Sequence, residues 1–319
     1  MRPRKPKHTA FLVIVATVLL AGLVFAPSAP AHTASGNATF PSTLITPLTG
    51  ASLDTPARGR TFLCGTGPGV VMTNASTPWV SGNAIDVSQI PHVAGNVRWR
   101  TRFKVTTSAT RRHFKGNGLP NTKTGEFPVQ MGTAAYPYYA ALPAQGYANA
   151  AEIPIRPWDL DITVPRWPRV NRTPACIGKL TIGIADTGAP WHVEIAPDAQ
   201  YRILNPSAGL PMDKCWGHPY ATQYHYHGQS WTCFRNRDKP NEHSPLEGYA
   251  IDGFGIYGIR GIDGKPVTNK QLDECHGHIH RILSEGEMVK IYHYHLNGEY
   301  PYSLGCFRGT PAILPRQAS

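Results

Sequence analysis

The same tetrapeptide occurs twice in this sequence, as Tyr224-His225-Tyr226-His227 and as Tyr292-His293-Tyr294-His295. In both places Asp-x-Cys-x-Gly-His precedes it and Cys-Phe follows it. Ordered matches of such rare residue types indicate an internal duplication. The offset between the copies grows from 60 residues at the first cysteines (275 − 215) to 68 at the histidines (293 − 225). This growth predicts an insertion between Gly-His and the tetrapeptide of the second copy.

The tetrapeptide has a direct physical interpretation as a β-strand. Side chains alternate between the faces of a strand, so two tyrosines lie on one face and two histidines on the other. The histidine Cα atoms are then roughly 6.6 Å apart. Two imidazoles at that separation can converge on one ion, with Zn–N bonds of about 2.0–2.1 Å. If a pseudo-twofold axis relates the copies, we expect both histidine pairs to meet in one site; the alternative is ordinary hydrogen-bonded histidines beside packed tyrosines.

The duplication extends upstream of the cysteines. Residues 183–190 resemble residues 248–255 at an offset of 65 (248 − 183), and each stretch is an apolar strand that ends in a Gly-containing turn. The repeat units are therefore about 180–243 and 247–310. Glycine (31) and proline (30) are frequent and only 16% of residues are charged, which favours short strands and long loops over helices. The predicted fold is a mainly β, pseudo-twofold duplicated, antiparallel sandwich-like domain with little helix.

The N-terminal residues have the pattern of a secretory signal. Residues 1–31 combine a basic start, an apolar run over 11–26 and Ala29-Pro30-Ala31. An uncleaved membrane anchor is the alternative, and no other stretch is long and apolar enough to cross a bilayer. We expect residues 32–60 to be a flexible lead-in, 61–96 to be N-terminal strands or an extension, and 97–314 to be the domain that contains the repeats.

Six cysteines follow the signal, which suits an oxidising compartment. The duplication favours the equivalent disulfides Cys215–Cys233 and Cys275–Cys306, which leaves Cys64 and Cys176 as the third pair. The alternative is that Cys215 and Cys275 are thiolate ligands of zinc.

A second pattern lies in residues 97–105, where apolar and basic residues alternate. Val97, Trp99, Thr101, Phe103 and Val105 face one way in a strand, whereas Arg98, Arg100, Arg102 and Lys104 face the other. The formal net charge is +11, or +7 without the four basic residues of the signal (11 − 4). An anionic envelope polymer or glycan is one partner for such a face, and a solvated edge guarded by charge is the alternative. Binding of nucleic acid is disfavoured, because the chain has the pattern of a secreted protein and lacks a platform of aromatic residues for stacking bases.

These motifs together resemble the YHYH-domain family, which is named for the tetrapeptide. The resemblance covers about residues 97–310, including the segments 250–258, 272–278 and 301–309. Gly255 stands where the family usually has proline, and Thr187 where it often has asparagine. The resemblance implies an exported, mostly bacterial protein, located in or beyond the cell envelope, but it implies no particular reaction. His293-x-His295-x-x-x-Glu299 also resembles the first metal-binding motif of cupins, which makes Glu299 a further candidate ligand.

The functional prediction is a secreted metalloprotein that binds copper or zinc, because imidazoles suit both metals. The candidate ligands are His225, His227, His293, His295, His218, His278 and Asp273. Asp213 and Asp273 are also expected to orient ligating imidazoles. The alternative is a non-catalytic module that binds anionic envelope polymers. No Gly-x-Ser-x-Gly elbow is present and all cysteines are assigned to disulfides, so a serine or cysteine hydrolase is disfavoured and no catalytic residue is assigned.

Overall fold

A computed structural model describes residues 42–47, 49–67, 69–73, 76–141, 150–197, 203–228, 233–234 and 238–314. All of them lie in the compact unit Gly36–Ser319. The signal peptide expected over residues 1–31 lies outside the described residues. The described fold is mainly β with little helix, as predicted.

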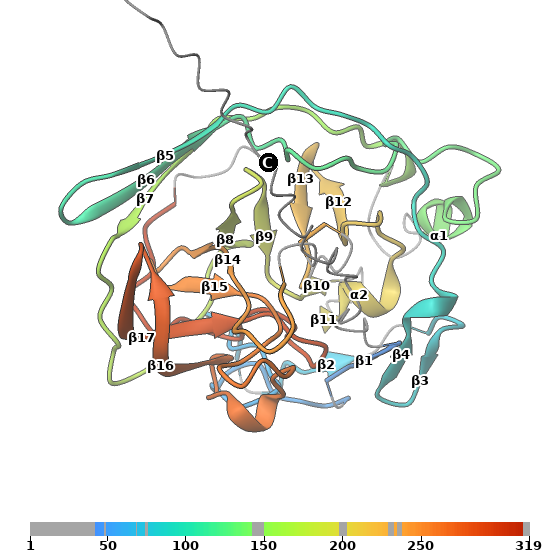
Figure 1. Ribbon diagram of the computed structural model, residues 1–319. Coiled ribbons are helices and arrows are strands. Elements are labelled where there is room, and N and C mark those ends of the chain that lie inside the picture. Colours follow the sequence, from blue (N-terminus) through green and yellow to red (C-terminus); the bar gives the residue numbers. More distant parts are fainter. Residues whose placement is uncertain are drawn as a thin grey trace, which may run out of the picture. The chain divides into compact units, whose positions relative to one another are not determined.

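The central element is an eight-stranded sheet in the order β12-β13-β9-β8-β14-β15-β17-β16 (Figure 1). Its first half consists of β8 (Thr181–Ala185), β9 (Pro190–His192), β12 (Gly217–Tyr220) and β13 (Gln223–Tyr226). Its second half consists of β14 (Leu246–Ala250), β15 (Gly255–Tyr257), β16 (Gly277–Ser284) and β17 (Glu287–His295). The β13–β9 and β15–β17 pairs are parallel, so the sheet is mixed rather than wholly antiparallel.

The register of the two central strands shows the pseudo-twofold symmetry. β8 and β14 are antiparallel, with Ile184 opposite Tyr249, and 249 − 184 is the repeat offset of 65. The flanking pairs are symmetric about this position. The same register shift recurs between Thr181 and Gly183 and between Leu246 and Gly248. The dyad therefore passes between β8 and β14, perpendicular to the sheet.

The predicted insertion lies in the outer hairpin of the second half. His218 is paired with His225 across β12–β13, and His278 is paired with His293 across β16–β17. The chain needs seven residues to return in the first hairpin (225 − 218) and fifteen in the second (293 − 278). The eight extra residues lengthen β16 and β17, which pair as far as Ser284 and Glu287.

Three smaller sheets accompany the large one. The first joins β5 (Phe103–Thr107), β6 (Arg111–Gly116) and β7 (Leu160–Pro165). The second joins β1 (Thr43–Ile45), β4 (Ala84–Asp86) and β3 (Val80–Ser81). The third joins β10 (Ala196–Pro197), β11 (Ile203–Leu204) and β2 (Met72–Thr73). The helical elements are α1 (Tyr136–Ala141), α2 (Pro206–Gly209) and 3-10 turns at Val87–Gln89, Ala150–Glu152 and Asn269–Gln271.

Two expectations for the N-terminal half are corrected. The segment 42–60 is not wholly a flexible lead-in, because β1 lies within it and Leu44 and Leu53 are buried in the core. The amide of Ile45 also donates to the carbonyl of Gly298, which ties this segment to the end of the second repeat. The basic segment 97–105 alternates in burial as far as Lys104, whereas Val105 is exposed, and regular pairing with β6 begins only at Phe103.

The disulfides Cys215–Cys233 and Cys275–Cys306 are those favoured by the duplication, and Cys64–Cys176 is the expected remaining pair. The zinc-thiolate alternative is therefore wrong, because neither Cys215 nor Cys275 has a free thiol. Among the described residues, no helix has the length and apolar character needed to span a membrane.

Candidate metal centres

The histidine faces of the two hairpins form two separate clusters, each with three imidazoles. We define the first centre as His218, His225 and His227, and the second centre as His243, His293 and His295. In each of them one ligand nitrogen per residue lies within 4.8 Å of the others. The strands β13 and β17 are separated by β9, β8, β14 and β15, which places the tetrapeptides roughly 24 Å apart at about 4.8 Å per strand. The expectation that both pairs meet in one site is therefore wrong, because the dyad places them near opposite ends of the sheet.

The ring nitrogens of the first centre approach as metal ligands do. His227 Nε2 lies 3.0 Å from His225 Nε2 and 3.3 Å from His218 Nε2. Nitrogens bound tetrahedrally to one ion at about 2.0–2.1 Å would be roughly 3.3 Å apart. The two strands explain the convergence, since His218 and His225 are a cross-strand pair and His227 follows two residues later on the same face.

A buried carboxylate stands behind the first centre. Glu194 is fully buried, its Oε2 accepts a hydrogen bond from Ser207 Oγ, and its Oε1 lies 3.3 Å from His227 Nδ1. That contact is within ion-pair distance, although its angle is too poor for a regular hydrogen bond. A carboxylate at Nδ1 favours a proton there and leaves the Nε2 lone pair free for a metal.

The second centre has similar spacings. His293 Nε2 lies 3.1 Å from His295 Nε2 and 3.3 Å from His243 Nε2. His293 and His295 come from β17, whereas His243 comes from the loop that precedes β14. His293 and His295 are fully buried and His243 is half-buried.

All three Nδ1 atoms of the second centre face main-chain carbonyl oxygens. His243 Nδ1 lies 2.7 Å from Ser244 O, His293 Nδ1 lies 3.2 Å from Ile291 O, and His295 Nδ1 lies 2.6 Å from Gly258 O. A carbonyl oxygen only accepts hydrogen bonds, so these contacts favour the tautomer with the proton on Nδ1, which leaves Nε2 as an acceptor. In these tautomers three acceptors converge without a donor between them, an arrangement that suits a bound cation.

Two further histidines border the centres. The His192 ring stacks on His225 with centroids 3.8 Å apart, and its Nε2 is buried without a hydrogen-bond partner among the described residues. The His278 ring lies 4.8 Å from that of His293 and 4.9 Å from that of His295. His278 Nδ1 lies 3.1 Å from Gln271 O, so its Nε2 also holds a lone pair.

Burial favours the neutral form of several imidazoles in and beside the two centres. It lowers the pKa of His293 to about 2 and the pKa of His278 to about 4, and nearby imidazoles contribute to both shifts. Burial also lowers the pKa of His218, His225 and His295 well below the usual value. Neutral imidazole is the form that binds metals, so these side chains are ready as ligands near neutral pH.

The carboxylates expected to assist the metal instead serve the tyrosine face of the sheet. Asp213 accepts from Tyr224 OH and from the amides of Cys215 and Gly217. Asp273 accepts from Tyr292 OH and from the equivalent amides of Cys275 and Gly277, and lies 3.2 Å from Arg308 Nε. Tyrosine and histidine point to opposite faces, so neither carboxylate lies with the grouped ligand atoms. The predictions of Asp273 as a ligand and of both as orienting groups are corrected.

Packing against a tyrosine explains why each Gly-His pair begins with glycine. A Cβ atom at Gly217 would collide with the hydroxyl of Tyr224, and one at Gly277 would collide with that of Tyr292. The tyrosine ring crosses directly over this glycine to reach its aspartate. The motif Asp-x-Cys-x-Gly-His therefore encodes a tyrosine clamp on one face and a histidine on the other.

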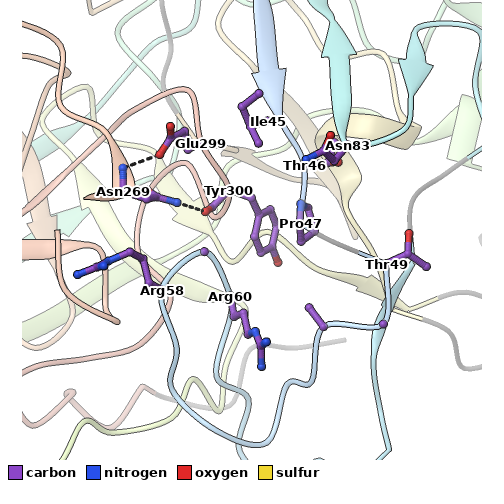
Figure 2. A pocket seen from close by; sticks show the side chains of 13 residues that line it. Ile45, Thr46, Pro47, Thr49, Arg58, Arg60, Asn83, Asn269, Glu299 and Tyr300 are labelled. Atoms are coloured by element: carbon purple, nitrogen blue, oxygen red, sulfur yellow. Dashed lines mark hydrogen bonds between the residues drawn. The ribbon is translucent and has the colours of Figure 1, made fainter. Parts of the chain in front are cut away.

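Glu299 is also located away from the histidine clusters. It lines a cleft of about 540 Å³ together with Arg58, Arg60, Asn269 and Tyr300 (Figure 2). Its Oε2 accepts a hydrogen bond from the amide of Asn269. The turn after β17 directs this side chain toward β1 and the loop around Arg58, so the likeness to the cupin motif does not extend to the position of the carboxylate.

Sequence analysis missed His243, His192 and Glu194. His243 lies at the boundary between the two repeat units, and the positions 65 residues before and after it are Gly178 and Arg308. His192 and Glu194 follow the first repeated strand, where the second copy has Tyr257 and Ile259 (192 + 65 and 194 + 65). Because neither copy predicts these residues from the other, the repeat carried no signal for them.

Residues 161–271 match the family model described as YHYH protein. The chain contains a YHYH domain. The resemblance to this family is confirmed over these residues, which include the first tetrapeptide and end before the second. No curated protein and no solved structure matches the chain.

Proposed function

We propose that this protein binds copper or zinc at two separate imidazole centres, one in each half of the YHYH domain's duplicated sheet. The first centre uses His218, His225 and His227, and the second uses His243, His293 and His295. His278 lies beside the second centre as a fourth imidazole. Nitrogen ligands of this kind suit both metals.

One observation carries the proposal. The three Nδ1 atoms of the second centre face carbonyl oxygens at 2.7, 3.2 and 2.6 Å, so three Nε2 lone pairs point at one another. Leaving a buried polar atom without a partner costs about 1–3 kcal/mol. A bound cation satisfies all three nitrogens at once, whereas neutral rings that carry their protons on Nδ1 leave the three Nε2 atoms without a donor.

The proposed location is outside the cytoplasm. Three disulfides within one chain are typical of exported proteins. In an oxidising compartment, histidine is a more durable copper ligand than a free thiolate, because thiolates there are oxidised. The disulfide-bonded cysteines and the histidine centres are thus consistent with one environment.

Elemental analysis of protein exported by its host and purified without an affinity tag tests the proposal. We expect about two copper or zinc ions per chain, because two centres with equal ligand types are present. His113→Ala is a suitable control, since His113 bonds Asp161 far along the chain from either centre. Protein that remains metal-free after incubation with both ions would refute the proposal.

A second candidate function is the binding of an anionic envelope polymer. Arg98, Arg100, Arg102 and Lys104 are exposed, and none of them forms an ion pair with another described residue. Such a cationic stripe attracts polyanions in a salt-dependent manner. Retention on an anionic-polysaccharide resin should fall with added salt and with Arg98→Ser/Arg100→Ser/Arg102→Ser, whereas an unchanged elution would exclude this role.

A further inference from the structure

A row of imidazoles leads from the outer part of the β16–β17 hairpin to the second centre. His278 and His280 are two residues apart on β16, so both lie on the face that carries His293. The His280 and His278 ring centroids are 4.0 Å apart, and the His278 and His293 centroids are 4.8 Å apart. His280 is half-buried, whereas His293 is fully buried. The row therefore runs from partly solvated to buried surroundings.

Two ring nitrogens of this row have no assigned structural role. His278 Nε2 and His280 Nδ1 are buried atoms that lack a hydrogen-bond partner within the described part of the chain. Each costs about 1–3 kcal/mol in that state. His278 Nδ1 faces Gln271 O at 3.1 Å, so the unpartnered Nε2 is a free acceptor, as it is in the centre itself.

The first copy of the repeat has no such row. The position equivalent to His280 is Tyr220 (280 − 60), whose side chain is 48% exposed. The turn of the first hairpin follows Tyr220 directly, at Ala221 and Thr222. The strands of the second hairpin stay paired as far as Ser284 and Glu287. An imidazole beyond the Gly-His position is therefore specific to the second copy.

We propose that His280 and His278 form an entry path for the metal ion of the second centre. This inference rests on the proposed function. A hydrated cation cannot reach His293 and His295 without losing its water, and removing an ion from water costs several kcal/mol unless ligands replace that water. Imidazoles at successive 4–5 Å steps replace the water gradually: each ring displaces a water molecule, holds the ion, and is itself displaced by the next ring. The path thus speeds exchange without contributing to the final coordination.

The rate of zinc release tests the path. Zinc-loaded protein is mixed with an excess of the chromogenic chelator 4-(2-pyridylazo)resorcinol and followed by stopped flow. His293→Ala/His295→Ala identifies the phase that belongs to the second centre, because that phase disappears. We expect His280→Ala to slow this phase about tenfold, equivalent to about 1.4 kcal/mol in the barrier, while zinc content stays unchanged. Tyr220→Ala, at the matched position of the first copy, should alter neither phase.

The outcomes separate the two proposals. Wild-type protein that binds zinc at neither centre would refute the metal function and the path together. Full zinc content with wild-type release from His280→Ala would refute the path alone. Retained zinc content in His280→Ala also shows that the variant is folded, so a slower phase is not a consequence of unfolding.

Discussion

The two centres use the same strands and the same tetrapeptide, yet they differ in what surrounds the paired histidines. In the first centre the third imidazole is His218, from the partner strand of the hairpin, and a buried carboxylate, Glu194, backs His227. In the second centre the third imidazole is His243, from a loop, and carbonyl oxygens back all three rings. The comparison teaches that the duplicated sheet places the same two imidazoles in each half, whereas positions at which the two copies differ decide which groups surround those rings.

The largest expected effect concerns the disulfides that close each half. Removing either bridge as a Cys→Ala pair should cost about 2–5 kcal/mol of unfolding free energy. The loop closed by Cys275–Cys306 spans 31 residues and that closed by Cys215–Cys233 spans 18. Loop-closure entropy therefore predicts about 0.5 kcal/mol more loss for the second half. Urea unfolding measures both losses, and a first-half variant that is clearly the less stable would contradict this ranking.

The next effect is the acid sensitivity that His276 contributes, which has no counterpart at the equivalent position of the first half. Burial lowers the pKa of His276 from 6.5 to about 4, whereas the equivalent first-half residue is the non-titrating Trp216 (276 − 60). The folded protein then binds fewer protons than the unfolded chain, so stability is full above pH 6.5 and falls as the pH drops toward 4. The loss amounts to up to about 3 kcal/mol.

His276→Asn should flatten that decline in the metal-free protein, and asparagine tolerates the positive φ of 77° at this position. Urea unfolding at pH 7.5, 6 and 5 measures the slope. A variant that loses stability with acid as steeply as the wild type would show that His276 is not responsible.

Glu194 should distinguish the affinities of the two centres. Glu194→Gln removes the buried charge behind His227, and loss of such an orienting carboxylate typically lowers metal affinity about 10–100-fold. Only the first centre should weaken, and Glu299→Gln, which alters a carboxylate outside both centres, should weaken neither. Zinc titration against a competing chelator measures this, and an equal loss at both centres would contradict the assignment.

The smallest effect concerns the inner tyrosines. Tyr294 OH donates to Asp252 Oδ2 at 2.6 Å, whereas Tyr226 OH contacts the hydroxyls of Thr122 and Thr187 at 3.0 Å. Asp252 and Thr187 are equivalent positions (252 − 187 = 65). Tyr294→Phe leaves a buried carboxylate short of a donor and should cost about 2 kcal/mol, against about 1 kcal/mol for Tyr226→Phe. Thermal unfolding of both variants measures the two losses of stability. A larger loss for Tyr226→Phe than for Tyr294→Phe would contradict the prediction.

Much of the fold was predictable because the duplication constrains it twice. The disulfides Cys215–Cys233 and Cys275–Cys306 and the insertion in the second hairpin follow from positions that both copies share, and Cys64–Cys176 follows as the remaining pair. The expectation that the two histidine pairs share one site was wrong, because the sequence does not show where the dyad lies. The structure places it between β8 and β14. With that axis, four strands separate His225 from His293.

The candidate centres were predictable only as far as the alternation of the strands reaches. His225 and His227 share a face by strand geometry alone, and so do His293 and His295. His243 and Glu194 occupy positions that do not match between the two copies, and only tertiary packing brings them to the rings. The same alternation excludes Asp213 and Asp273, since a group that binds the tyrosine hydroxyls lies on the opposite face of the sheet.

The central claim is that each half of the sheet holds its own ion. Native mass spectrometry of zinc-loaded wild type, His225→Ala/His227→Ala and His293→Ala/His295→Ala tests it most directly. We predict two bound ions in the wild type and one in each double variant. Retention of both ions by either variant, or loss of both ions from a folded one, would contradict two independent centres.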